Sequence, residues 1–360
     1  MSEHRESIKK VLVTGNMGYI GSVLVPELLT SGYEVSGYDI GYYDDDCCVD
    51  EDTQKGKIHQ IVKDIRDISK ADVKGIDAII HLAALSNDPL GELDSSLTEE
   101  INLNATLKLA AFAKECGVKR FVYSSSQSMY GISKTTDELD EESTEKNPLT
   151  VYARTKWVAE KELKKLCADN FLVVCFRLST VFGASPKLRC DIVYNNLVAC
   201  AYTTHKIEIK SDGTPCRPVV HVRDVCSAFL AGLLAPRSLL SGESFNVGIK
   251  DGNFTIRDLA ENAQKVIPNS SVSFTNEHGT DSRTYRISFK KIYSVLKDYY
   301  KPKWDLTNGG QELRELFEKI QFTEEQFRGR TCTRLHQIKY LIDKGIIDKM
   351  LRRVVKGERY

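Results

Sequence analysis

Long hydrophobic runs are missing from this chain of 360 residues. No stretch approaches the roughly 20 apolar residues that a membrane-spanning helix needs. The N-terminal residues 1–7 (MSEHRES) also lack the apolar core of a secretory signal. We therefore expect no membrane partner.

The chain also lacks an excess of charge of either sign, because 50 lysines and arginines balance 50 aspartates and glutamates. Without a global positive field, nothing favours binding to nucleic acid. The ten cysteines contain no C-x-x-C pair, which predicts free thiols in a reducing cytoplasm. The acidic stretch 44–52 is interpreted as a solvated loop, and no metal site is predicted.

Glycine is concentrated where the chain begins. The apolar run 11–14 leads into Gly15, Gly18 and Gly21, and an apolar helix-like segment follows. In a turn of this spacing, one glycine permits the tight bend, one lets backbone amides approach a pyrophosphate, and one lets the helix pack on the strand. The N-terminus of the helix then faces the anion. The spacing predicts a dinucleotide-binding turn.

The next predicted strand, 33–39, ends in Asp39, at the distance where a dinucleotide fold places a carboxylate on the ribose hydroxyls. No arginine or lysine follows directly. Since a 2′-phosphate would be repelled by that carboxylate, the pattern favours NAD over NADP.

Strand-like and helix-like segments alternate through the first half of the chain. The strands are predicted at 11–14, 33–39, 58–62, 78–82, 121–125 and 172–178. This alternation indicates an α/β fold, a Rossmann-type doubly wound parallel sheet with helices on both faces. The clearest helix is predicted at 98–117. We expect residues 1–182 to form the NAD-binding domain, with a return of the chain around 218–248.

The rest of the chain, 183–217 and 249–360, is expected to form a smaller substrate-binding lobe with C-terminal helices. Near the C-terminus an apolar stripe at helical spacing predicts a helical hairpin packed on that lobe. The stripe contains Leu335, Ile338, Leu341 and Ile342.

Tyr152 and Lys156, in the middle of the chain, form a candidate acid–base pair. At i and i+4 on a helix they project from one face. A nearby cation favours the phenolate, so the pair can exchange a proton near neutrality. The strand 121–125 precedes them and leads to Ser126, which we expect at the carboxyl edge of the sheet, where such folds bind ligands.

Together these motifs resemble the extended short-chain dehydrogenase/reductase superfamily, in its nucleotide-sugar epimerase/dehydratase branch. The resemblance implies Ser126, Tyr152 and Lys156 as catalytic residues, with Tyr152 as the base. It also implies that Tyr152 and Lys156 contact the cofactor. Further contacts are implied for the glycine turn, for Asp39, and for a turn at Asp64 and Ile65 that would contact the adenine (the adenine turn). The strand end after His81 and an asparagine that relays a proton complete the implied set. These further cofactor residues are Gly15, Gly18, Tyr19, Ile20, Gly21, Asp39, Asp64, Ile65, Leu82, Ala83, Ala84 and Asn102.

The substrate implied by the resemblance is a nucleotide-diphosphate sugar. The residues expected to bind it are Ser126, Gln127, Thr180, Arg189, Asn196, Arg217 and Arg283. Gln127 and Ser128 replace the acidic residues of the family's dehydratases and decarboxylases, which disfavours both reactions. Thr180 replaces an asparagine of many UDP-sugar epimerases, so the base and the sugar stay open.

Three functions are compatible with this resemblance. The favoured one is a nucleotide-sugar 4-epimerase. The alternative is a nucleotide-sugar 4-dehydrogenase or 4-ketoreductase, and the third is a non-catalytic NAD-binding protein, which the Tyr152/Lys156 pair disfavours. Family resemblance further implies a homodimer through a four-helix bundle built from the helices around 103–114 and 152–167.

Overall fold

The computed structural model describes residues 7–44, 47–86, 94–131, 137–275, 277 and 285–354. Its centre is a seven-stranded sheet with the order β11-β7-β5-β4-β1-β2-β3, in which every neighbouring pair is parallel. The strands are β1 Lys10–Thr14, β2 Glu34–Asp39, β3 His59–Val62, β4 Ala78–His81, β5 Arg120–Ser126, β7 Leu172–Leu178 and β11 Ser244–Val247. The predicted α/β fold is confirmed, and each predicted strand is present.

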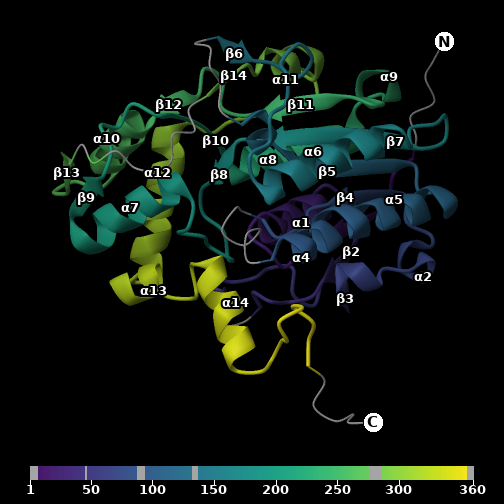
Figure 1. The fold of residues 1–360 in the computed structure, drawn as a ribbon, viewed down its shortest axis with the longest axis horizontal. Helices are drawn as coiled ribbons and strands as arrows, with labels where there is room; N and C mark the ends of the chain where they lie inside the picture. The colour runs from purple at the N-terminus through teal and green to yellow at the C-terminus, as the bar shows by residue number, and fades with distance from the viewer. Residues whose placement is uncertain are drawn as a thin grey trace.

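Helices cover both faces of this sheet (Figure 1). Along β1, Val11 and Val13 belong to one buried core and Leu12 to another, because successive side chains of a strand point to opposite faces. The first core includes α1 (Gly21–Thr30) and α8 (Val222–Leu234), and the second includes α5 (Ala105–Glu115) and α6 (Val151–Lys164). The inner strands β1, β4 and β7 are buried on both faces and read as largely apolar runs, whereas β3 at the edge of the sheet is partly exposed.

The helix predicted at 98–117 is present but irregular. It consists of α4 (Ser95–Glu99), a π-helical turn over Glu100–Asn104, and α5. A π-helical turn widens the helix locally and is frequent at functional sites. Asn102 lies within this turn.

A separate core lies beyond the main sheet, on the left in Figure 1. Helices α7 (Val193–Thr204), α10 (Ile256–Val266) and α12 (Leu306–Lys319) share it. Smaller sheets join it: β12-β10-β8, formed by Asn253–Thr255, Cys216–His221 and Thr180–Phe182, and β13-β9, formed by Ser271–Phe274 and Lys206–Ile209. The separate core agrees with a second lobe, while its boundaries in sequence stay a prediction.

Short elements complete the described chain. They are α2 Lys70–Val73, α9 Arg237–Leu240, α11 Lys290–Val295, α13 Glu324–Arg328, α14 Arg334–Asp343, the strand pair β6 Glu138–Leu139 and β14 Arg286–Ile287, and the 3₁₀ turns Ile65–Asp67 and Gln127–Tyr130. Within the described ranges no helix is long and apolar enough to cross a membrane.

The C-terminal helix packs elsewhere than the sequence suggested. Ile338 and Leu341 of α14 are buried in the same core as Leu12 and Tyr38 of the main sheet, and not in the core of the second lobe. The apolar stripe was predicted correctly, but its partner was not. A stripe specifies that a helix face is buried, and the partner depends on contacts with residues some 300 positions earlier in the chain.

Candidate active site

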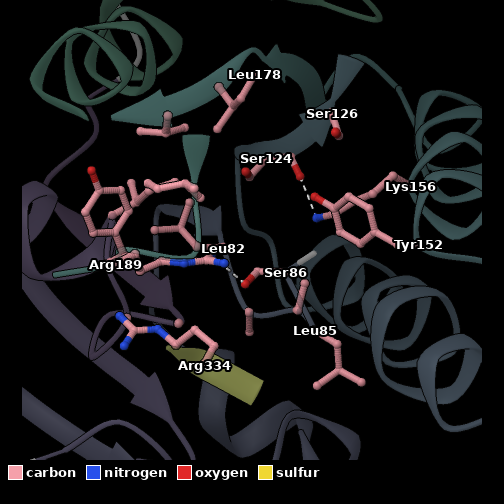
Figure 2. Close-up of a pocket in the computed structure, with 18 of the residues that line it drawn as sticks. Leu82, Leu85, Ser86, Ser124, Ser126, Tyr152, Lys156, Leu178, Arg189 and Arg334 are labelled. Carbon is pink, nitrogen blue, oxygen red and sulfur yellow. Dashed lines mark hydrogen bonds between the residues drawn. The ribbon is translucent and has the colours of Figure 1, made fainter. Parts of the chain in front are cut away.

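A cavity of about 690 Å³ lies at the carboxyl ends of the central strands. The residues that line it come from the glycine turn, from β2, β5 and β7, from the loop after β4, and from the second lobe (Figure 2). This is where a doubly wound sheet binds its ligand.

The glycine turn is shaped by contacts that only glycine permits. Gly15 has φ of 75° and donates its backbone N–H to the Tyr38 carbonyl at 2.9 Å. A Cβ on Gly21 would lie 2.4 Å from the Gly15 oxygen, so the helix could not approach the strand. At Gly18 the nearest atom to such a Cβ is the Gly15 oxygen at 3.2 Å. Gly18 lines the cavity, so a side chain there would occupy space needed by a ligand.

Asp39 ends β2 at the cavity wall. Its carboxylate accepts N–H bonds from Met17 at 3.1 Å and Gly41 at 2.8 Å. Burial raises the pKa of this carboxyl. Two anchored oxygens facing a cavity suit the two hydroxyls of a ribose.

The adenine turn also lies on the cavity wall, through Asp64 and Ile65. Asp64 caps the 3₁₀ turn through the Arg66 backbone N–H and forms an ion pair with the Arg66 side chain, with Nη2 to Oδ2 at 2.6 Å. The carboxylate of Asp64 therefore fixes the turn.

Leu82, Ala83 and Ala84 line the cavity directly after β4. The preceding His81 is buried, and its two ring nitrogens lie 2.7 Å from the hydroxyls of Thr14 and Thr106. Burial lowers the pKa of His81 to about 3, which keeps the ring neutral.

Asn102 does not line the cavity. Its side chain accepts the Leu85 N–H at 2.8 Å and donates to the Leu85 carbonyl at 3.1 Å. Through these two bonds it holds the loop that follows the cavity-lining strand end.

Ser126, Tyr152 and Lys156 lie together on one side of the cavity (Figure 2). The Lys156 Nζ donates to the Ser124 carbonyl at 2.7 Å and lies 6.0 Å from the centre of the Tyr152 ring. Burial lowers the pKa of Lys156 to about 7. The Ser126 and Ser128 hydroxyls are 2.9 Å apart.

A buried ion pair fixes α6 against the sheet. Glu160, one turn after Lys156, pairs with Arg177 of β7 at 2.6 Å, with both side chains at most 2% exposed. Glu160 also accepts hydrogen bonds from Ser125 at 2.6 Å and Ser244 at 2.7 Å. Helix α6, which carries Tyr152 and Lys156, is thereby attached to β5, β7 and β11.

Some predicted substrate residues reach the cavity and others do not. Thr180, Arg189 and Arg217 line it. Gln127 instead points into the protein, where its amide bonds the carbonyls of Arg177 and Val247 and the Ser179 hydroxyl.

Asn196 is likewise turned away, because its amide donates to the Cys190 carbonyl at 2.9 Å. Neither Gln127 nor Asn196 lines the cavity, so the structure does not support their predicted contacts. Arg283 lies outside the described residues.

Several lining residues were not selected from the sequence. They are Tyr42, Tyr43, Ser86, Asp191, Tyr285, Thr333, Arg334 and Leu335. Asp191 pairs with Arg189 through two contacts of 2.8 and 3.0 Å. Arg334 begins α14, and only the position of that helix brings it to the cavity.

Comparison with known proteins shows which family has a sequence and fold of this kind. Residues 11–248 match the model of the NAD-dependent epimerase/dehydratase family. The chain belongs to this family. A UDP-glucose 4-epimerase of Lactobacillus helveticus is 31% identical over 277 residues, covering 71% of this chain and 81% of that protein. A human dTDP-D-glucose 4,6-dehydratase is 26% identical, covering 80% and 84%.

Among solved structures, MoeE5 in complex with UDP-glucose and NAD superposes with a TM-score of 0.71 at 26% identity, covering 87% of this chain and all of that one. This confirms the Rossmann-type fold. Family membership makes the chain an enzyme of the extended short-chain dehydrogenase/reductase type with NAD as its cofactor.

The residues present fit that cofactor. The open face at Gly18 accommodates a pyrophosphate, and the carboxylate of Asp39 faces the cavity where a ribose would lie. Within the described ranges no cluster of metal-ligating side chains is present.

Proposed function

We propose that this chain is a nucleotide-sugar 4-epimerase. The observation that carries the proposal is the convergence of Ser126, Tyr152 and Lys156 on one cavity with the glycine turn and Asp39. A UDP-glucose 4-epimerase among its relatives points to the same chemistry.

In the proposed reaction, Tyr152 takes the proton from the C4 hydroxyl of the sugar. Ser126 donates a hydrogen bond to the same oxygen and orients it. In its protonated form Lys156 places positive charge near the phenolate and stabilises it. Bound NAD supplies the hydride acceptor for C4 and later the hydride donor.

Epimerisation further requires that the sugar turn while its nucleotide stays fixed. Arg217 and Thr180 line the cavity from the second lobe and are proposed to hold the nucleotide diphosphate. Arginine suits this task because its planar fork binds two phosphate oxygens. Binding energy from the remote nucleotide then orients the reacting carbon.

The surroundings of Ser126 disfavour elimination of water. Its cavity-lining neighbours Ser124, Ser125 and Ser128 are neutral, and Gln127 is held in the interior. A dehydratase needs a further acid and base at this point. This supports the epimerase over the 4,6-dehydratase activity named for the human relative.

The test uses the protein as purified. After denaturation, released nucleotide is identified by mass, and the intact enzyme is incubated with UDP-, GDP-, CDP- and dTDP-sugars without added cofactor. We expect NAD to be released and one sugar to be converted to its C4 epimer, seen by NMR. A reaction that proceeds only with added NAD and accumulates absorbance at 340 nm would instead identify a 4-dehydrogenase.

Tyr152→Phe is the matched variant. It removes the base and leaves the ring, so we expect bound NAD at the wild-type level and turnover reduced at least about 100-fold. Undiminished turnover would refute the assignment of Tyr152.

We also propose a homodimer in which α5 and α6 pack on the same helices of a second copy. In the structure these two helices lie side by side and share one core. A monomeric mass in light scattering would contradict this. A cytoplasmic location is proposed because all ten cysteines are thiols.

A further inference from the structure

Arg334 is a buried cation in the wall of the cofactor cavity (Figure 2). Its side chain is 2% exposed. One guanidinium nitrogen, Nη2, donates to the Lys187 carbonyl at 2.5 Å, and the guanidinium carbon lies 4.4 Å from the centre of the Tyr43 ring. The other nitrogen, Nη1, is buried and has no hydrogen-bond partner among the described residues.

Arg334 forms no side-chain ion pair among the described residues, although the nearby Asp191 attracts its charge. The neighbouring Arg189 is paired with Asp191 through two contacts, and Asp191 also accepts the backbone N–H of Arg334 at 3.3 Å. Burial and repulsion from Arg189 lower the pKa of Arg334. A buried donor without a partner is costly, so the unpaired Nη1 of an arginine that lines the cavity points to an anionic ligand.

The position of Arg334 identifies which part of the cavity this ligand occupies. Tyr43, on which the guanidinium stacks, comes four residues after Asp39. The same C-terminal segment contacts the intervening backbone: Gln337 donates to the Tyr42 carbonyl at 3.0 Å, and Arg353 to the Gly41 carbonyl at 2.9 Å.

The segment reaches the adenine turn as well. Arg66 donates to the Met350 carbonyl at 2.9 Å, and Arg352 lies 3.4 Å from the Asp64 carboxylate. Residues 334–354 therefore contact both loops expected to hold the adenosine half of the cofactor.

We propose that Arg334 binds the pyrophosphate of NAD, so that the C-terminal segment completes a cofactor site whose wall also contains the glycine turn. A guanidinium matches two phosphate oxygens, and the anion satisfies the open Nη1 donor. The proposal rests on NAD being the cofactor and is independent of whether the enzyme epimerises or oxidises its sugar.

The first experiment measures how fast the holoenzyme exchanges bound NAD for isotope-labelled NAD. We expect Arg334→Gln to release NAD about 10 to 100 times faster than the wild type, because one charge-assisted contact is lost. Arg334→Lys keeps the charge and should restore most of the retention. The control is Arg314→Gln, which removes a half-exposed arginine of α12 paired with Glu318 and should leave the exchange rate unchanged.

The second measurement separates binding from folding. In nucleotide-free protein we expect Arg334→Gln to unfold at the same temperature as the wild type or higher, since the substitution removes a buried cation that has no ion-pair partner among the described residues. A variant that unfolds earlier or fails to fold would show that Arg334 stabilises the chain itself, and would overturn the proposal.

The third measurement distinguishes the pyrophosphate of NAD from the diphosphate of the nucleotide-sugar substrate, since both are proposed to bind in this cavity. Affinity for UDP should be the same in Arg334→Gln and in the wild type. Weaker UDP binding with unchanged NAD exchange would assign the guanidinium to the substrate and refute the proposal, as would unchanged binding of both.

Discussion

Replacing Lys156 with methionine tests the electrostatics of the site most directly. The lysine is 4% exposed, and burial lowers its pKa from 10.5 to about 7. In the unfolded chain it is protonated up to about pH 10.5, so between pH 7 and 10.5 the unfolded state binds a proton that the folded state gives up. The folded state is therefore penalised fully below pH 7 and not at all above pH 10.5.

The size of the effect follows from these two pKa values. At pH 7 the penalty is on the order of 4 kcal/mol, and at pH 9 it falls to about 2 kcal/mol. Methionine removes this penalty but also the hydrogen bond to the Ser124 carbonyl, which costs about 1 kcal/mol. We expect Lys156→Met to be more stable than the wild type by about 3 kcal/mol at pH 7 and by about 1 kcal/mol at pH 9.

The assay is urea unfolding of nucleotide-free protein at both pH values. Lys161→Met on the same helix is the control, because Lys161 is exposed and should show no such pH dependence. The Lys156 variant should also lose turnover, since no cation then stabilises the Tyr152 phenolate. A variant less stable than the wild type at pH 7, or a difference that does not change with pH, would refute the reasoning.

Two other substitutions test how the site is supported. Glu160→Gln leaves Arg177 buried without its counter-ion, and we expect a loss of about 3–5 kcal/mol in urea unfolding; a loss under 1 kcal/mol would contradict a structural role for the pair. Gly21→Ala places a Cβ 2.4 Å from the Gly15 oxygen and should reduce the NAD that co-purifies at least about 10-fold. Gly32→Ala, whose Cβ meets no atom within 4 Å, is the control for backbone strain alone and should retain its NAD.

The parts of this fold that were predictable depend on local pattern. The inner parallel strands are buried and mostly apolar, so their positions were visible in the sequence, as was the turn at Gly15, Gly18 and Gly21. The positions of Tyr152 and Lys156 on one helical face follow from the helical repeat. Local pattern therefore predicted that these side chains lie together at one side of the cavity.

The parts that were missed depend on side-chain direction and distant contacts. Gln127 follows Ser126 directly, but the 3₁₀ turn over Gln127–Tyr130 points its amide into the interior, where Arg177 and Val247 offer carbonyls. Arg334 carries no local signal at all. It reaches the cavity because α14 packs on the main sheet, and no periodicity within 334–343 encodes that choice.

Cofactor retention connects the C-terminal segment to the proposed reaction. A 4-epimerase must keep its reduced cofactor until the hydride returns to the same carbon, whereas a dehydrogenase must exchange it after each turnover. If Arg334 binds the cofactor as proposed, a segment that also contacts the loops at Gly41 and Asp64 should slow exchange, which suits the first case. If Arg334→Gln accelerates NAD exchange, it should also uncouple the reaction, so that 4-keto sugar escapes in proportion to the NADH lost. Faster exchange without any 4-keto product would mean that retention is not what limits epimerisation in this enzyme.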